Sequence, residues 1–320
     1  MSSFHNGLPE RMSAALATRY GGPEVIKIVE VPLPVLHAGM VMVRVAASAV
    51  NSGDARTRGL QVEEPIKTLI RLVLGLRKPR RPILGTVFSG TVAAIGTNVT
   101  SFKVGDAVFG SSPGMRYGCH AQYVAVPASG PVALMPSSMG FKDAAALPFG
   151  GNTAQYFLKK HEAKTGESIL INGATGTVGT MAVQIANILG LEVTGVASGK
   201  NKTLVSELGA SHFIDYTLGR VFSPGVKYDL VMDTVGKLDK ARVKAALKPG
   251  GRFINVCGSD VARENQQQVE KLAQWFKAGS IRAVIDKVLP MEEAREAHHI
   301  VDTGHKRGSV ILMMDQEERI

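Results

Sequence analysis

The stretch from residue 168 to residue 189 most constrains how this chain can fold. The apolar run "SILING" (168–173) leads into three glycines at a spacing of three, and a helix is expected from about Val178 to Leu189. Four more apolar runs alternate with segments of helical period as far as residue 280. Such strand–helix alternation predicts a doubly wound parallel sheet with helices on both faces. We expect this α/β domain over residues 136–280.

The two ends of the chain have a different sequence pattern from that of the α/β domain. Short β-type runs separated by Gly and Pro fill residues 1–135, and similar runs return in "AVIDKVLP" (283–290) and "GSVILMM" (308–314). This pattern is typical of an all-β unit. We therefore expect one β-rich domain, formed by residues 1–135 and 281–320, that the α/β domain interrupts.

The glycine-rich turn predicts a dinucleotide site. Gly173 permits a tight turn, Gly176 lets the backbone approach a pyrophosphate, and Gly179 lets the helix pack closely on the strand. Ala174 stands where the first glycine usually lies. The helix N-terminus offers free N–H groups to phosphates. A tight turn without a ligand is the alternative. The other residues expected to contact the cofactor along these strand ends are Thr175, Thr177, Val178, Val235 and Gly236.

The end of the second strand indicates which dinucleotide is bound. NAD sites usually place Asp or Glu there, about 20 residues after the turn. This chain reads "VASGKNK" instead, in which Ser198, Lys200 and Lys202 can hold a 2′-phosphate. Tyr216, which closes the third strand, can cover the same phosphate. A solvated helix start is the alternative for the lysines, but the missing acid favours NADPH.

Several longer motifs carry a family resemblance. They include "ASAVNSGDARTRG" (47–59), "PILGTVFSGTVAAIGTNVTSFKVGDAVFG" (82–110), "AAALPFGGNTA" (144–154) and "ALKPGGRF" (246–253). With these motifs the chain resembles the zinc-independent medium-chain dehydrogenases/reductases, close to the quinone oxidoreductase (zeta-crystallin-like) branch. The resemblance extends from near Met12 to near Met313. It implies a GroES-like catalytic domain, a Rossmann domain, and an active site between them.

The same resemblance bears on metal binding. In zinc-using relatives a cysteine stands at the position of Asn51, and a His-Glu pair stands at Thr86 and Val87. Two cysteines in the whole chain cannot supply the four thiolates of those relatives' structural zinc site. We therefore expect no metal.

Without a Lewis acid, the expected chemistry is hydride transfer to a conjugated acceptor. The resemblance implies quinones, enones or enals as acceptors. It places Asn51 and Thr153 beside the nicotinamide and the substrate carbonyl, where donors would stabilise a developing oxyanion. A turn-forming Asn and a helix-capping Thr are the alternatives. Asp54 matches an acidic family position, and pairing with Arg56 or Arg58 is its alternative.

The chain departs from the family pattern at two places near this site. Arg56 stands where quinone reductases commonly carry Tyr, and Val87 replaces an aspartate of the "GxDFSG" stretch. The first change removes one candidate proton donor, so no general acid can be named. An NADPH-binding regulatory or RNA-contacting protein with little turnover is the alternative function.

The net charge and the two longest candidate targeting segments indicate which partners and which cellular location to expect. The net charge is +10, and the densest basic tract is "LRKPRRP" (76–82). No nucleic-acid motif accompanies this tract, so we expect a solvated loop beside an anionic-ligand site. The longest apolar run, "TLIRLVLGL", is too short to span a bilayer. The first residues do not read as a signal peptide, and we expect a cytoplasmic protein.

The segment after "GRFINVCG" (251–258) predicts a shortened sheet. It runs through "SDVAREN" directly into a helix, whereas the resembling family has a further helical segment and a sixth strand there. A parallel crossover needs a dozen or more residues. We expect five strands ordered 3-2-1-4-5, with "RFINV" at the edge. The family often pairs its sixth strands across a dimer, and we expect that contact to be absent. Either the "SDVAREN" loop covers the edge strand or two chains pair through it, and we favour a homodimer by a different surface.

Overall fold

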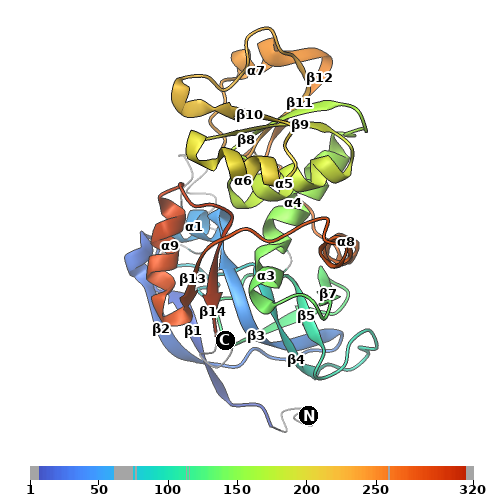
Figure 1. Cartoon of the computed structure of the whole chain (residues 1–320). Helices are drawn as coiled ribbons and strands as arrows, with labels where there is room; N and C mark the ends of the chain where they lie inside the picture. The colour runs from blue at the N-terminus through green and yellow to red at the C-terminus, as the bar shows by residue number, and fades with distance from the viewer. Residues whose placement is uncertain are drawn as a thin grey trace.

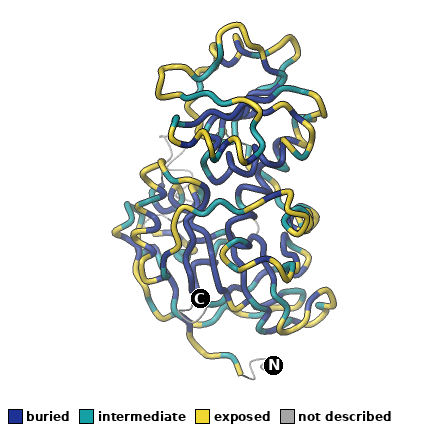
Figure 2. Tube along the Cα trace, in the orientation of Figure 1, coloured by how far each residue is buried: buried dark blue, intermediate teal, exposed yellow. Residues whose placement is uncertain are grey.

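The computed structural model describes residues 7–60, 75, 78–112, 114, 116–258 and 260–314. These residues form two sheet-based parts, one above the other in Figure 1. Each part has its own buried interior, shown in dark blue in Figure 2. None of the helices in the described ranges has the length and apolarity needed to cross a membrane.

The upper part is the predicted doubly wound sheet. Its five strands run parallel in the order β10-β9-β8-β11-β12, which confirms the expected 3-2-1-4-5 arrangement and places "RFINV" in the edge strand. The strands are β8 (Ser168–Asn172), β9 (Glu192–Ala197), β10 (His212–Asp215), β11 (Tyr228–Asp233) and β12 (Leu247–Asn255).

Alternation within the central strand explains why helices cover both faces. Ile169 and Ile171 of β8 join the interior formed with α4 and α5, whereas Leu170 packs with Val243 of α7 on the opposite face. Successive side chains of a strand point to opposite faces, so an unbroken apolar run suits a strand buried on both sides. The helices that flank this sheet are α4 (Pro148–Lys160), α5 (Thr177–Ile188), α6 (Lys202–Glu207) and α7 (Lys240–Ala246). α8 (Gln266–Lys277) follows β12 and lies lower, beside β7, in Figure 1.

The lower part is β-rich and combines both ends of the chain. One sheet has the order β13-β14-β3-β4-β5-β7, with β6 also paired to β3, and β1 pairs with β2 in a separate ribbon. Its strands are β1 (Arg11–Ala17), β2 (Ile26–Pro32), β3 (Met40–Val50), β4 (Val87–Ile95), β5 (Ala107–Ser111), β6 (Tyr123–Pro127), β7 (Val132–Leu134), β13 (Ile285–Pro290) and β14 (Ser309–Met313). The helices α1 (Ser52–Gly59), α3 (Phe141–Ala146) and α9 (Ala294–Asp302) lie beside it.

Short 3-10 turns punctuate these elements. They are η1 (Pro23–Val25), η2 (Gly199–Asn201), η3 (Tyr216–Leu218) and η4 (Met291–Glu293).

Two contacts join the parts around the predicted site. α8, which packs against α4 in the upper part, also packs against β7 of the lower part. The loop before β14 reaches the glycine-rich turn, where Gly308 forms a parallel bridge with Gly176. The site therefore lies where α4, the turn before α5 and the loop before β14 meet (Figure 1).

Candidate active site

The glycine-rich turn has the geometry that its sequence predicts. Gly173 has a φ of +79°, which favours glycine, and its N–H donates to the carbonyl of Val196. A Cβ on Gly179 would lie 2.0 Å from the carbonyl oxygen of Gly173, so only glycine allows α5 to approach this closely. A Cβ on Gly176, the N-cap of α5, would meet only that same oxygen, at 3.6 Å. The turn thus leaves open space at the α5 N-terminus, as a phosphate requires.

The residues expected from two neighbouring strand ends meet this turn. A Cβ on Gly173 would lie 2.5 Å from Cγ2 of Val235, so the two residues are adjacent. The Asp233 carboxylate accepts the N–H groups of Val235 and Gly236, each at 3.0 Å, and fixes the loop after β11. Thr175 and Thr177 lie in the turn itself, and Thr177 begins α5.

A lysine from the other part of the molecule also reaches the turn. The Lys306 ammonium group donates to the Thr177 hydroxyl and, at 2.5 Å, to the Gly308 carbonyl. Burial lowers the pKa of Lys306 to about 8. A cation at a helix N-terminus is unfavourable by itself, because the helix dipole is positive there. A bound pyrophosphate would offset this repulsion. Sequence reasoning missed Lys306, since 129 residues separate it from Thr177.

The four residues expected at the 2′-phosphate lie around the end of β9. Ser198 precedes η2, and its hydroxyl accepts from the Asn201 side chain at 2.9 Å. Lys200 and Lys202 are exposed, and Tyr216 begins η3 at the end of the neighbouring β10 with 45% of its surface exposed.

One carboxylate lies closer to this site than the sequence indicates. A Cβ on Gly199 would be 2.3 Å from Oδ2 of Asp215, at the end of β10. Hydrogen bonds from Thr217 lower the pKa of Asp215, so this carboxylate is charged at neutral pH. The end of β9 carries no carboxylate, as expected, but the end of the neighbouring strand β10 places the Asp215 carboxylate beside it.

Asn51 caps α1 and faces Thr86. Its side-chain oxygen accepts the N–H groups of Gly53 at 2.8 Å and Asp54 at 3.2 Å, and its side-chain nitrogen donates to the Thr86 hydroxyl at 2.9 Å. The Asp54 carboxylate in turn accepts the Asn51 N–H, which completes a capping box. The side-chain oxygen of Asn51 therefore caps α1, while its side-chain nitrogen binds the Thr86 hydroxyl. The second amide hydrogen and the Thr86 hydroxyl hydrogen are the donors available to an oxyanion.

Thr153 lies inside α4 and caps no helix terminus. Its hydroxyl donates to the Phe149 carbonyl at 2.6 Å, one turn earlier. Phe149 in turn lies near the start of α1, since a Cβ on Gly53 would be 3.8 Å from its ring. α4 thus presents Phe149 and Thr153 on the face that looks toward α1, because residues four apart share a helix face.

The two residues that depart from the family pattern, Val87 and Arg56, lie in different environments. Val87 is buried in β4 opposite Ser111. Arg56 is exposed on α1, and its guanidinium lies 3.2 Å from the Cys257 thiol in the loop after β12. Arg56 therefore connects the two parts at the site.

Asp54 belongs to a buried polar cluster behind α1. Its carboxylate accepts the Gly85 N–H at 3.0 Å and lies 4.0 Å from the His120 ring, while Arg58 pairs with Asp302 at 2.5 Å. Burial raises the pKa of Asp54, although the nearby His120 opposes this shift. The hydrogen bonds of Asp54 come from the N–H groups of Asn51 and Gly85. Arg58 still acts on Asp54 through its charge, whereas Arg56 is directed to Cys257.

The cluster continues into α9. The rings of His120 and His298 meet edge to face with centroids 5.6 Å apart, and burial lowers the pKa of both histidines. Neither ring nitrogen of His298 has a hydrogen-bond partner among the described residues. Across those residues, no group of three His, Cys, Asp or Glu side chains is arranged to hold a metal ion.

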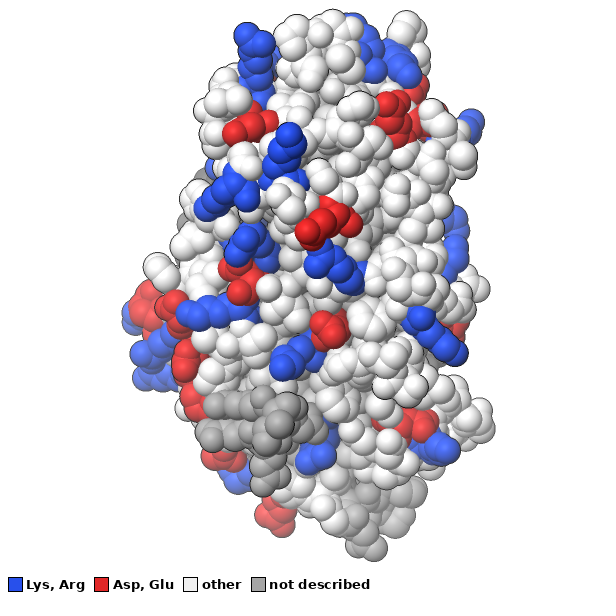
Figure 3. Space-filling model, viewed as in Figure 1, with Lys and Arg blue, Asp and Glu red and all other residues white. Residues whose placement is uncertain are grey.

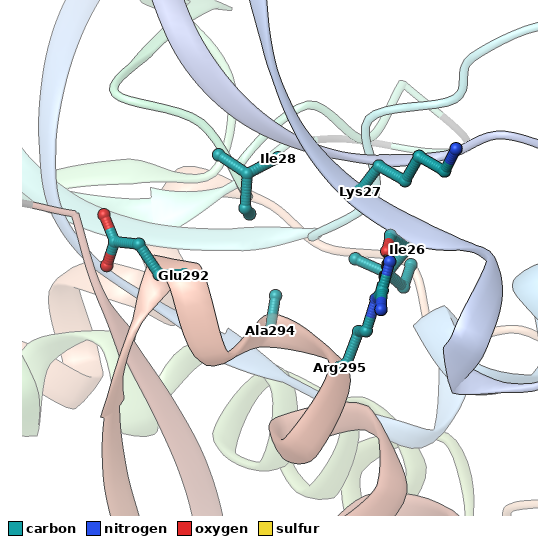
Figure 4. A pocket seen from close by; sticks show the side chains of 6 residues that line it. All are labelled: Ile26, Lys27, Ile28, Glu292, Ala294 and Arg295. Atoms are coloured by element: carbon teal, nitrogen blue, oxygen red, sulfur yellow. Dashed lines mark hydrogen bonds between the residues drawn. The ribbon is translucent and has the colours of Figure 1, made fainter.

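A separate pocket of about 200 Å³ lies between β2 and the start of α9 (Figure 4). Ile26, Lys27 and Ile28 line one side, and Glu292, Ala294 and Arg295 line the other. Arg295 donates to the Ile26 carbonyl at 2.7 Å, so its charge serves the packing of α9 on β2. None of the predicted site residues lines this pocket.

The surface charge is mixed where it can be seen. On the face in Figure 3, Lys and Arg side chains are interspersed with Asp and Glu. The basic tract 76–82 lies partly outside the described residues, which include Lys78, Arg80 and Arg81.

Comparisons with known proteins agree with this architecture. The alcohol dehydrogenase GroES-like domain matches residues 37–137, and the zinc-binding dehydrogenase domain matches residues 177–294. The chain is 30% identical to the quinone oxidoreductase of Homo sapiens, over 95% of this chain and 98% of that protein. It is 29% identical to the chloroplastic NADPH-dependent alkenal/one oxidoreductase of Arabidopsis thaliana, over 95% of this chain and 80% of that protein.

A solved structure gives the same result. The quinone oxidoreductase from Coxiella burnetii superimposes with a TM-score of 0.83 at 26% identity, over 95% of this chain and all of that one. The chain therefore belongs to the medium-chain dehydrogenase/reductase family, in its quinone oxidoreductase branch.

Proposed function

We propose that this protein reduces quinones or α,β-unsaturated carbonyl compounds with NADPH, and that it does so without zinc. One observation carries the proposal: Asn51 and Thr86, at two positions where zinc-using relatives carry metal ligands, are hydrogen-bonded to each other. An amide nitrogen and a hydroxyl are poor zinc ligands but good donors to an oxygen that gains negative charge. Conjugated acceptors suit such a site, since their negative charge spreads over an enolate or hydroquinone.

The cofactor site fits a dinucleotide with phosphate groups. The turn at residues 173–179 would hold the pyrophosphate on the α5 N-terminus, with Lys306 as a cation beside it. Lys200 and Lys202 favour a 2′-phosphate, and one relative, the NADPH-dependent alkenal/one oxidoreductase, supports this choice by its name. When bound, the nicotinamide supplies a hydride to the acceptor. Asn51 and Thr86 orient the acceptor's carbonyl, and Thr153 lies on the facing side of α4.

The proposed function is tested by following NADPH absorbance with a panel of quinones, enals and enones. We expect turnover with at least one acceptor class and none with simple saturated ketones. Tight NADPH binding without turnover on any acceptor would instead favour an NADPH-binding regulatory protein. We keep the cytoplasm as the proposed location, and cell fractionation is its test.

Zinc independence has a direct test. Prolonged dialysis against a chelator should leave the reductase activity unchanged, because the proposed site uses no metal ligand. Elemental analysis should find far less than one zinc per chain. Zinc at one per chain, whose removal and return take the activity away and restore it, would contradict the proposal.

A further inference from the structure

Arg56 reaches from one part of the molecule to the other. It lies on α1, five residues after Asn51, and its guanidinium donates to the Cys257 thiol at 3.2 Å, in the loop after β12. Gly53 stands three residues before Arg56, so the two share one face of α1. A Cβ on Gly53 would lie 3.8 Å from the Phe149 ring of α4. Arg56 therefore lies on the side of α1 that faces α4 and the site.

The thiol that Arg56 contacts lies where the nicotinamide half of the cofactor is expected. A Cβ on Gly236, after β11, would lie 2.7 Å from Cβ and 3.3 Å from Sγ of Cys257. The residues expected at the 2′-phosphate stand at the end of β9, and the pyrophosphate turn stands at the end of β8. The strand order β9-β8-β11-β12 leaves the ends of β11 and β12 for the other half of the dinucleotide. The end of β12 is two strand spacings, about 10 Å, from the pyrophosphate turn.

Arg56 has no carboxylate partner among the described residues. The Cys257 thiol is a weak acceptor, whereas a guanidinium has five N–H donors. Three acidic side chains of the adjoining elements are engaged elsewhere. Asp54 and Asp233 accept backbone N–H groups, and Asp260 pairs with a lysine of α4 at 2.6 Å. The positive charge of Arg56 is thus available to a ligand.

Two further exposed cations stand next to the same elements. Lys237 lies in the loop after β11, directly after the glycine that meets the thiol. Arg116 directly precedes Tyr117, whose hydroxyl lies 2.8 Å from that of Thr57 on α1. Exposed positive charge therefore stands on both parts of the molecule around Arg56. Such a charge distribution attracts anionic ligands.

We propose that Arg56 is a specificity-determining residue that favours acceptors carrying a carboxylate or a phosphate group. This inference rests on the proposed reductase function. A guanidinium stays charged at neutral pH, and its planar fork of N–H donors matches both anions. The anionic group of the acceptor replaces the Cys257 thiol as the partner of Arg56, while the acceptor's carbonyl lies at Asn51 and Thr86.

The test measures kcat/KM for enone acids and for their methyl esters, in a series with two, three or four methylene groups between the β-carbon and the carboxylate. The wild type should prefer the best acid over its ester by about fivefold, the upper range for an ion pair exposed to solvent. Arg56→Gln should bring this ratio close to one, Arg56→Lys should retain part of it, and Arg56→Glu should favour the ester. Arg242→Gln changes an exposed arginine on α7, so this matched control should keep the wild-type ratio.

Three readouts separate an ion pair from a structural role of Arg56. Added salt should narrow the ratio of acid to ester in the wild type and leave the ratio in R56Q as it is. The loss in R56Q should lie in the KM of the acid, because a contact remote from the reacting carbon stabilises bound substrate and transition state alike. A hydroxy-enone and its phosphate monoester form a second matched pair, which shows whether carboxylate or phosphate is the preferred anion.

A binding measurement keeps this inference separate from the reductase proposal. Calorimetric titration of the NADP⁺ complex with a saturated keto acid and with its methyl ester needs no turnover. The acid should bind about fivefold more tightly than the ester to the wild type, and equally to R56Q. Acid-selective binding without turnover would support the role of Arg56 and remove only the reductase proposal. Turnover of neutral enones without any acid preference would remove only the role of Arg56.

Equal kcat/KM values for the charged and the neutral member of every pair in the wild type would overturn the assignment. A preference for the anion that persists in R56Q would overturn it as well, since another cation would then be responsible. A loss of NADPH affinity in R56Q as large as the loss of acid preference would show that Arg56 serves the cofactor, and would also overturn it.

Discussion

At the scale of single residues, charge placement decides which cofactor is bound. Lys200 and Lys202 carry exposed positive charges beside Ser198, and Asp215 places a negative charge next to Gly199. The lysines favour a 2′-phosphate, and the aspartate opposes it. The net preference therefore depends on a small difference between attraction and repulsion in a solvated site.

We expect NADPH to bind at least about tenfold more tightly than NADH, a difference of about 1.4 kcal/mol. Changing Lys200 and Lys202 to Ala should reduce this preference, and Ser198→Asp should reverse it. Asp215→Asn should increase it, since the repulsion is removed. The measurement is a fluorescence titration with each cofactor, with Lys244→Ala on α7 as the control. Equal affinities in the wild type would rule out the phosphate pocket.

Lys306 gives the cofactor site a pH dependence of known sign. Its pKa is lowered to about 8, so the ammonium group is charged below pH 8 and neutral above it. The pyrophosphate that would face Lys306 stays ionised between pH 7 and pH 9, and the 2′-phosphate at the end of β9 is also ionised at pH 7, because its second pKa is about 6. The NADPH Kd should therefore rise between pH 7 and pH 9, and Lys306→Met should abolish this change and weaken binding at pH 7 by about tenfold.

The neighbouring cation provides the control for Lys306. Arg307 is exposed and lies 3.7 Å from Asp286, so Arg307→Met should retain the pH dependence. A wild-type Kd that does not change between pH 7 and pH 9 would show that Lys306 does not face the cofactor.

At the scale of elements, α9 carries a titratable group into the interior. His298 is fully buried without a partner for either ring nitrogen among the described residues, and burial holds its pKa well below 6.5. The folded state thus keeps His298 neutral, while the unfolded chain binds a proton below pH 6.5. Stability is present above this pH and is lost as the pH falls.

Replacing His298 with Leu should therefore make the protein less sensitive to acid. Urea unfolding should show a smaller loss of unfolding free energy between pH 7 and pH 5 in H298L than in the wild type. His299 is exposed on the same helix, so His299→Leu should leave the pH dependence as it is. Identical pH dependence in H298L and the wild type would mean that His298 is solvated or paired.

Local pattern predicted the elements much better than the contacts between them. The five strands and the helices that follow them were readable because their apolar runs and helical periods are local. Val235 and the glycine-rich turn were also predictable, since parallel strand ends meet at one edge. Lys306 was not, because it reaches the turn from a distant loop and has no local signature. Asp215 was missed because β10 places it beside η2 only after the sheet has formed.

At the scale of the whole molecule, the shortened sheet leaves β12 at an edge. Among the described residues, no strand pairs with its outer side, and the loop that follows attaches to α4 through Asp260. Exposed edges invite pairing with another chain. We propose that any homodimer uses a surface other than this β12 edge. Light scattering gives the assembly state, and a dimer that survives a charged substitution at Phe253 of β12 would support the proposal. Dissociation by that substitution would contradict it.

The central claim is that the two parts together form a site for hydride transfer to a conjugated acceptor. The most direct test uses NADPH that carries deuterium at both C4 positions of the nicotinamide, with an enone in ordinary water and NMR of the product. We predict a saturated ketone with deuterium at the β-carbon, formed in equal amount to the NADP⁺ produced. A product without deuterium at the β-carbon, or NADPH consumption without any reduced product, would contradict the account.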